Sequence, residues 1–331
     1  MQTSRKLSHA LLALFALVVL AGSAFAQGSP YPQQSAVSDQ KAGSILFYNY
    51  YTSDAANPGA RNTRINITNT STTSTAVVHL FFVQSTDCTA ADNFICLTAN
   101  QTASFLTSDV DPNTSGFLVA VAADQNGCPA PFNFLIGDEY VKTATHQANL
   151  GAEAFAALFA RPVCPAPDTN SVVLSFNGVE SLTSANYNQA PRVLALDNFA
   201  SPADGNNTIL VVNTVGGDLG GTVPSIGQVF MVVYDDAENP GSATLSLNNC
   251  QRIVTVNNAG IRTAPPISSL VPSGRSGWLK FSSTNAARAI LGAAINANGE
   301  TGFNGGHNLH KLTLVPNTLL TIPVFPPACG D

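Results

Sequence analysis

The chain has 331 residues, a formal net charge of −6 and only 10% charged residues. A weakly charged, mildly acidic surface argues against nucleic acid and anionic membrane surfaces as partners, because both attract basic patches. This composition suits an exported protein with neutral polar faces.

Residues 1–26 have the three parts of an export signal. A positively charged flank precedes an apolar run at residues 10–21, and the small residues Ala24 and Ala26 follow it. This pattern predicts cleavage between Ala26 and Gln27. A membrane anchor is disfavoured, since a spanning helix needs roughly 20 apolar residues. We expect no membrane span in the mature chain, and a secreted, cell-surface or periplasmic location.

Residues 27–41 are polar and contain proline, so a flexible leader is expected there. Beyond it, short strand-like segments alternate with turns. In residues 63–68, Ile65 and Ile67 alternate with polar residues, which predicts a strand with one apolar face. Residues 77–83 form an apolar run rich in β-branched and aromatic residues, typical of a central strand. Many short strands with frequent turns predict antiparallel β-sandwiches.

One series of segments occurs twice in the same order, which indicates an internal duplication. Its most distinctive part is the phrase Ser-Gly-aromatic-Leu, at residues 115–118 and again at 276–279, each time shortly after a proline. Gly116 and Gly277 would allow a tight backbone path where a strand begins. The matched segments are residues 45–53 with 193–201, 64–70 with 209–215, 77–83 with 228–234, and 131–137 with 289–295.

The aromatic residues of this phrase are Phe117 and the only tryptophan of the chain, Trp278. Because large aromatic side chains mostly serve packing, we expect both to anchor a hydrophobic core. The alternative is an aromatic platform for a sugar, for which Tyr48, Tyr50 and Tyr51 are the best candidates.

Residues 149–160 are rich in Ala and Leu and are followed by an Arg-Pro pair, which predicts a short helix. The predicted fold class is therefore all-β, with two tandem antiparallel immunoglobulin-like sandwiches and one short helix that closes the first. The first sandwich is expected at residues 42–163 and the second at residues 172–331, with a linker at residues 164–171.

All six cysteines lie after the expected cleavage point. An even number of cysteines in an exported chain indicates disulfide bonds. A metal site is less favoured, because the chain has no C-x-x-C pair. Spacing along the chain gives a preference among the possible pairings. The expected pairs are Cys88–Cys96, which would close a hairpin end, Cys128–Cys164, and Cys250–Cys329.

The segment NTRINITNTSTTSTAVVHLFFV, residues 62–83, joins two predicted strands through a polar turn. With the Gly-aromatic strand that follows, it resembles exported bacterial proteins of uncharacterised function that are built from immunoglobulin-like sandwich modules. The resemblance covers most of the mature chain. It implies a surface or secreted protein and carries over no catalytic residues.

Two stretches contain possible metal ligands. His307 and His310 would share one face of a helix, but in a strand, which the surrounding residues favour, they point to opposite faces. Zinc needs three or four ligands, and no carboxylate or cysteine lies nearby in the sequence to complete a site. Asp235, Asp236 and Glu238 form an acidic turn that could hold calcium, but they do not match the calcium-loop pattern. We expect no cofactor.

The sequence contains no G-x-S-x-G, H-E-x-x-H or phosphate-binding loop motif, so an enzyme is not expected. The leading hypothesis is a non-catalytic secreted or cell-surface protein with a structural or adhesive role, whose partners would be other surface proteins or glycans. A pair of carbohydrate-binding modules is the alternative. A secreted hydrolase with an unrecognised site is the third possibility.

Overall fold

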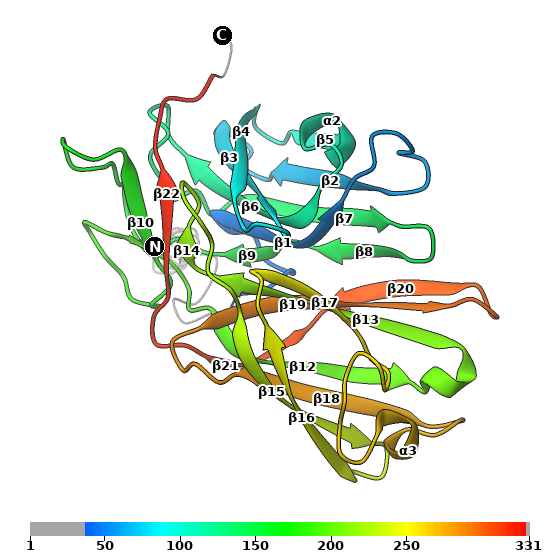
Figure 1. The fold of residues 1–331 in the computed structure, drawn as a ribbon. Coiled ribbons are helices and arrows are strands. Elements are labelled where there is room, and N and C mark those ends of the chain that lie inside the picture. Colours follow the sequence, from blue (N-terminus) through cyan, green and yellow to red (C-terminus); the bar gives the residue numbers. More distant parts are fainter. Residues whose placement is uncertain (1–36, 329–331) are drawn as a thin grey trace, which may run out of the picture. The chain divides into compact units, whose positions relative to one another are not determined.

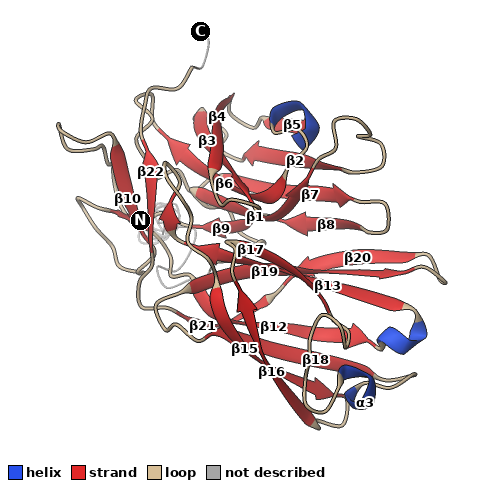
Figure 2. Ribbon diagram, viewed as in Figure 1, coloured by secondary structure: helices blue, strands red, loops and turns tan. Residues whose placement is uncertain are grey.

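A computed structural model describes residues 37–328 of the chain. The export signal, its cleavage point, most of the expected leader and Cys329 lie outside this range. In the described residues, strands dominate, as Figures 1 and 2 show. They form five sheets. The predicted all-β fold with antiparallel sandwiches is therefore confirmed.

The first sandwich packs a five-stranded sheet against a four-stranded one. Ile65 and Ile67 are fully buried between the two sheets together with Leu46, Phe82 and Leu118, as the alternating pattern predicted. The strand order of the five-stranded sheet is β4 (Ala90–Leu97), β3 (Ala76–Gln84), β6 (Ser115–Ala123), β1 (Ile45–Thr52) and β9 (Glu153–Phe155). The four-stranded sheet is β5 (Thr102–Leu106), β2 (Asn62–Asn69), β7 (Leu135–Lys142) and β8 (Gln147–Gly151).

The second sandwich repeats this arrangement strand for strand. Its core contains Leu194, Met231 and Phe281, all buried. The five-stranded sheet is β16 (Pro240–Leu247), β15 (Gly227–Asp235), β18 (Ser276–Ser283), β12 (Pro191–Ala200) and β21 (His310–Leu314). The four-stranded sheet is β17 (Gln251–Thr255), β13 (Asn206–Val215), β19 (Ala289–Asn298) and β20 (Phe303–Asn308).

A fifth, smaller sheet was not expected from the sequence. It joins segments that are far apart along the chain, since β10 pairs with β22 (Figure 1). Leu174 of β10 and Leu320 of β22 belong to one hydrophobic cluster with Phe47, Phe81 and Phe117 of the first sandwich. This sheet consists of β11 (Ala185–Asn186), β10 (Ser171–Ser175), β22 (Leu319–Pro323) and β14 (Gly217–Asp218).

The helix predicted at residues 149–160 is wrong. This stretch forms β8, which pairs with β7, and β9, which pairs with β1. The Ala-rich composition favours a helix locally, but pairing with the edges of both sheets overrides that weak preference. The helices of the described residues are short and lie elsewhere: α2 (Thr107–Val110), α3 (Ile267–Leu270) and the 3-10 turn η1 (Pro202–Asp204).

The repeated Ser-Gly-aromatic phrase has a structural cause in both sandwiches. Gly116 lies opposite Gln84 at the start of β6, and Gly277 lies opposite Asp235 at the start of β18. A Cβ atom on Gly116 would lie 1.8 Å from the backbone oxygen of Val83, and one on Gly277 would lie 2.8 Å from the backbone oxygen of Tyr234. The backbone of Val83 therefore leaves no room for a side chain at position 116, and that of Tyr234 leaves none at position 277.

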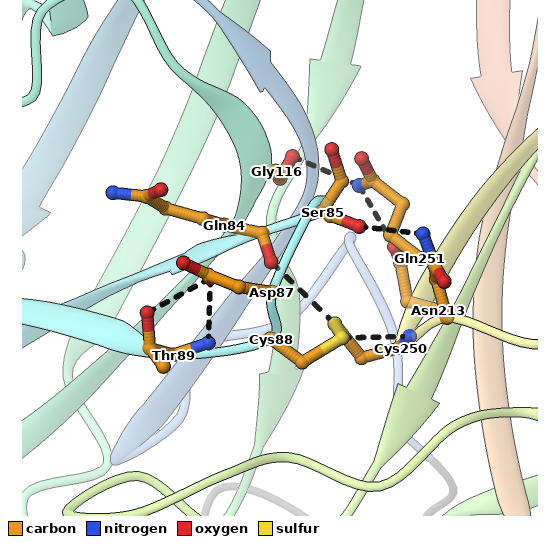
Figure 3. The surroundings of a disulfide bond; sticks show 10 residues. Gln84, Ser85, Asp87, Cys88, Thr89, Gly116, Asn213, Cys250 and Gln251 are labelled. Carbon is orange, nitrogen blue, oxygen red and sulfur yellow. Dashed lines mark hydrogen bonds between the residues drawn. A yellow bond between two sulfur atoms is a disulfide. The ribbon is translucent and has the colours of Figure 1, made fainter.

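A disulfide bond joins the two halves of the chain. Cys88, in the turn between β3 and β4, is bonded to Cys250, which lies just before β17 (Figure 3). The expected pairs Cys88–Cys96 and Cys250–Cys329 are therefore wrong. Because β4 is extended at about 3.3 Å per residue, Cys88 and Cys96 lie roughly 25 Å apart, too far for a bond.

The other described cysteines are also oxidised. Cys128 is bonded to Cys164, the pair that the spacing predicted. Cys96 forms a disulfide bond as well.

Candidate functional site

The outer faces of the two five-stranded sheets can be compared position by position, because their registers match. In both sheets, β1 and its counterpart β12 carry an irregularity at the same place, before Tyr51 and before Phe199. Alignment on the two glycines of the repeated phrase equates Phe117 with Trp278, Val119 with Lys280, Val121 with Ser282, Phe81 with Val232, and Val83 with Tyr234.

On the first sandwich this face is buried. Phe81 and Phe117 have exposed fractions of 0% and 1% because the small sheet formed by β10 and β22 packs over them. Phe47 and Phe117 stack with their ring centroids 5.0 Å apart. The face therefore forms a second core of the first half.

On the second sandwich the equivalent face is partly open to solvent. Trp278 is half-buried and stacks on Tyr234, with ring centroids 4.2 Å apart and an interplanar angle of 13°. Phe230 is 45% exposed, and Lys280 is exposed. The prediction that Trp278 anchors a core is wrong, although Phe117 does so. We call Phe230, Val232, Tyr234, Trp278 and Lys280 the outer face.

The tyrosines proposed from sequence as a sugar platform are buried. Tyr48 and Tyr51 have exposed fractions of 0%, and Tyr50 one of 9%. The Tyr48 hydroxyl donates a hydrogen bond to the backbone oxygen of Asn66, and the Tyr51 hydroxyl donates one to the Asp111 carboxylate. Tyr48 and Tyr51 therefore serve the interior of the first sandwich, and Tyr50 packs in a buried cluster shared by the two halves.

A polar groove of about 560 Å³ lies where residues 37–41 pass β20, β21 and Asp197. The chain from His307 to Lys311 forms one wall, and Asp197 borders it from β12. We call this feature the groove. It contains both histidines that the sequence singled out.

The groove brings the two histidines together around a carboxylate that is distant in the sequence. His307 Nε2 lies 3.7 Å from Asp197 Oδ1, and His310 Nε2 lies 3.4 Å from Asp197 Oδ2. Asp197 reaches them because it sits at the irregularity of β12, between Leu196 and Phe199. Partial burial raises the pKa of Asp197, but the hydrogen bond from His310 and the charges of both imidazoles outweigh this and hold it below its usual value.

A chain of buried side-chain amides crosses from the disulfide region to the groove. Gln251 Nε2 donates to Asn213 Oδ1, and Asn213 Nδ2 donates to Asn49 Oδ1, at 2.9 and 3.0 Å. Asn49 Nδ2 in turn donates to Asn308 Oδ1, and Asn308 Nδ2 donates to Asp39 Oδ2, at 2.8 and 2.9 Å. Figure 3 shows Gln251 and Asn213 at the disulfide end of this chain. These bonds fix β1, β13 and β20 to one another and hold Asp39 at the groove.

A buried ion pair lies beneath the groove. Glu153 is fully buried in β9, and Lys311 Nζ lies 2.5 Å from its Oε1 atom. Burial raises the pKa of Glu153 to about 7, against the opposing effect of the Lys311 charge.

The acidic turn proposed for calcium is occupied by its own hydrogen bonds. Asp235 Oδ1 accepts from the backbone amides of Ala237 and Asn239, at 3.0 and 2.7 Å. Asp236 forms an ion pair with Arg275. Glu238 has a left-handed backbone, with φ of 66°, and completes the hairpin between β15 and β16. The turn thus has a structural explanation.

One group of potential metal ligands in the described residues has all its ligand atoms close together: Asp124, Cys128 and Cys164. The two sulfur atoms are bonded to each other, so they are not thiolate ligands. Asp124 accepts hydrogen bonds from the backbone amides of Asn126 and Cys128, which shapes the turn.

A scan against family models and a search of curated proteins found no match. Among the described residues, no helix has the length and apolar character needed to span a membrane.

Sequence reasoning found His307 and His310 but missed Asp197. The chain separates Asp197 from His307 by more than a hundred residues, and only the pairing of β12 with β21, which puts Ala195 opposite His310, brings them together. The available signal was the position of Asp197 in the matched segment of residues 193–201. It lies two residues after Ala195, so in a strand both side chains point to the same face.

Proposed function

We propose that this chain is an exported, non-catalytic, adhesion-type protein whose outer face binds a neutral glycan. The observation that carries the proposal is the partly exposed Tyr234–Trp278 stack on a sheet face whose counterpart in the same chain is a buried core. The same strand arrangement carries a packing face in the first half and a partly exposed face in the second. The second face is therefore the one that is available to bind a ligand.

The matching strand orders and registers support an origin of both sandwiches from one immunoglobulin-like module. Ser53 Oγ and Ser201 Oγ provide independent support, because they donate equivalent hydrogen bonds to the backbone oxygens of Asp111 and Val271, each at 2.8 Å. On this view, residues 45–155 and 191–314, which contain the matching strands, are the two copies. The substitutions between copies then follow a pattern: Val119 becomes Lys280 and Val121 becomes Ser282. Both changes replace an apolar side chain by a polar one, as expected on a surface that contacts solvent.

The chemistry of the outer face fits a sugar better than a charged ligand. Sugars offer C–H faces to aromatic rings and hydroxyl groups to polar neighbours, and Tyr and Trp combine an apolar ring with a polar group. Thr244 of β16 lies opposite Phe230, and Ser282 of β18 lies opposite Phe230 on the other side. Of the five residues that define the outer face, only Lys280 is charged.

Export is supported by the N-terminal signal pattern and by the oxidised cysteines, because disulfide bonds persist in oxidising compartments. A bond that connects the two halves protects the arrangement of strands outside the cell.

The proposal is tested by titrating the mature protein with neutral oligosaccharides while recording tryptophan fluorescence. Trp278 is the only tryptophan, so a change in emission reports on the outer face directly. Binding measured by calorimetry should weaken in Phe230→Ala and Tyr234→Ala.

The matched control is Phe134→Ala, because Phe134 is 43% exposed on the first half and Phe230 is 45% exposed on the second. Absence of binding across a broad glycan array would reject the glycan. Binding that survives both outer-face substitutions would reject the face.

A further inference from the structure

The groove contains three side chains whose chemistry matches a transition-metal site, and this inference does not depend on the proposed function. His307 comes from the end of β20, His310 begins β21, and Asp197 comes from β12. Each imidazole Nε2 faces a different oxygen of the same carboxylate, at 3.7 and 3.4 Å. The two imidazole ring centroids are 6.2 Å apart, so both rings must turn towards each other to place three ligand atoms at about 2.0–2.2 Å from one ion.

The hydrogen bonding of His307 fixes which ring nitrogen is available. Its Nδ1 atom lies 3.0 Å from the backbone oxygen of Asn308. A carbonyl oxygen only accepts, so Nδ1 carries the proton and donates it. Nε2 is then the ring nitrogen left to face Asp197 and the groove, and a backbone carbonyl on the far nitrogen is the usual support of a metal-binding histidine.

We propose that Asp197, His307 and His310 bind one divalent transition-metal ion of the zinc class. Two imidazoles and one carboxylate form a donor set that suits zinc, nickel or copper better than calcium or magnesium, which prefer oxygen ligands. The side chains of His307, His310 and Asp197 are 40%, 57% and 62% exposed, so both rings can turn onto one ion without disturbing a core. The remaining coordination positions face the groove and hold water or an incoming ligand.

The site also has a rigid support. Asn308, next to His307, is held by Asn49 and by the backbone oxygen of Gly151, at 2.8 and 2.6 Å. Lys311, next to His310, is fixed by its ion pair with Glu153. The two histidines therefore flank a short segment whose backbone is anchored on both sides, which limits the entropy lost when the ion binds.

The experiment is calorimetric titration of the mature, oxidised chain with zinc chloride alone. We expect one ion per chain, and roughly 10- to 100-fold weaker binding in Asp197→Asn and in the double variant His307→Gln/His310→Gln. Cobalt(II) provides a second readout: the visible absorption of a tetrahedral N,O-ligated ion should appear with the natural chain and be lost in the variants. Calcium chloride should give no heat that depends on these three residues.

The control variant is Asp236→Asn, which removes an exposed carboxylate from the acidic turn and should leave zinc affinity unchanged. Circular dichroism checks that each variant is folded, which is expected because the substituted side chains are exposed. Zinc affinity that is equal in the natural chain and in Asp197→Asn would overturn the assignment, as would a natural chain that binds no zinc. A group that is only a histidine–carboxylate ion pair would bind no zinc.

Discussion

At the level of single residues, the unusual group is the buried carboxylate of Glu153. Burial raises its pKa from 4.5 to about 7, with the nearby Lys311 opposing the shift and Asp39 adding to it. The folded chain therefore retains a proton on this group over a pH range where the unfolded chain has lost it. Stability is highest below pH 4.5 with respect to this group and falls as the pH rises towards 7.

We predict that this group lowers the free energy of unfolding by roughly 3 kcal/mol between pH 4.5 and pH 8. Urea unfolding at several pH values measures the change. Glu139 is also fully buried with a raised pKa, and it contributes a slope of the same sign in every variant. The difference between the natural chain and Glu153→Gln isolates Glu153: the variant should lose less stability over this range. A difference that stays constant with pH would contradict the prediction.

At the level of elements, the repeated glycines decide whether β6 and β18 can lie against their neighbours. A Cβ atom at position 116 would meet the backbone of the adjacent strand at 1.8 Å, and neither strand can move without disturbing the ladder. At position 277 the nearest atoms lie at 2.7–2.8 Å and include the side chains of Val271 and Phe199.

We predict that Gly277→Ala lowers the free energy of unfolding by about 1–3 kcal/mol and that Gly116→Ala lowers it by more. Gly59→Ala is the control, because no atom lies within 4 Å of a Cβ at that turn position; its effect should be within about 0.5 kcal/mol. Denaturant unfolding monitored by circular dichroism measures all three. Equal effects at positions 59 and 116 would show that the close contact does not matter.

Elements with strong local patterns were predictable, and elements that depend on distant partners were not. The alternation at Ile65 and Ile67 and the apolar run at residues 77–83 specify strands by themselves, and both are strands. Residues 149–160 carry a helical composition but lie at sheet edges, so pairing decided their structure. The matched segment at residues 131–137 is a strand only in its last part, since β7 begins at Leu135 after a turn.

At the level of the whole molecule, the duplication of a strand series could be predicted from the sequence, whereas the features that distinguish the two halves could not. The small sheet that buries Phe81 and Phe117 pairs β10 with β22, which are far apart along the chain. No local sequence pattern predicts such a pairing. The same is true of the Cys88–Cys250 bond. Trp278 was misplaced for this reason: its position in the repeat is that of a buried residue, but the covering sheet exists only on the first half.

The two disulfide bonds whose cysteines both lie in the described residues should contribute unequally to stability. Cys88–Cys250 spans 162 residues and Cys128–Cys164 spans 36. In the chain-entropy model the longer loop stabilises by about 1.3 kcal/mol more. We therefore predict that Cys88→Ala/Cys250→Ala lowers the free energy of unfolding by about 1 kcal/mol more than Cys128→Ala/Cys164→Ala, measured by guanidinium unfolding.

The same unfolding curves test how the halves are joined once the longer bond is removed. Tyr50, Val141 and Leu150 of the first half share a buried cluster with Val211 and Ile295 of the second, and this contact does not need the bond. Unfolding of Cys88→Ala/Cys250→Ala should therefore remain a single transition at lower denaturant concentration. Two separated transitions would show that the disulfide bond, and not the shared cluster, makes the two sandwiches unfold together.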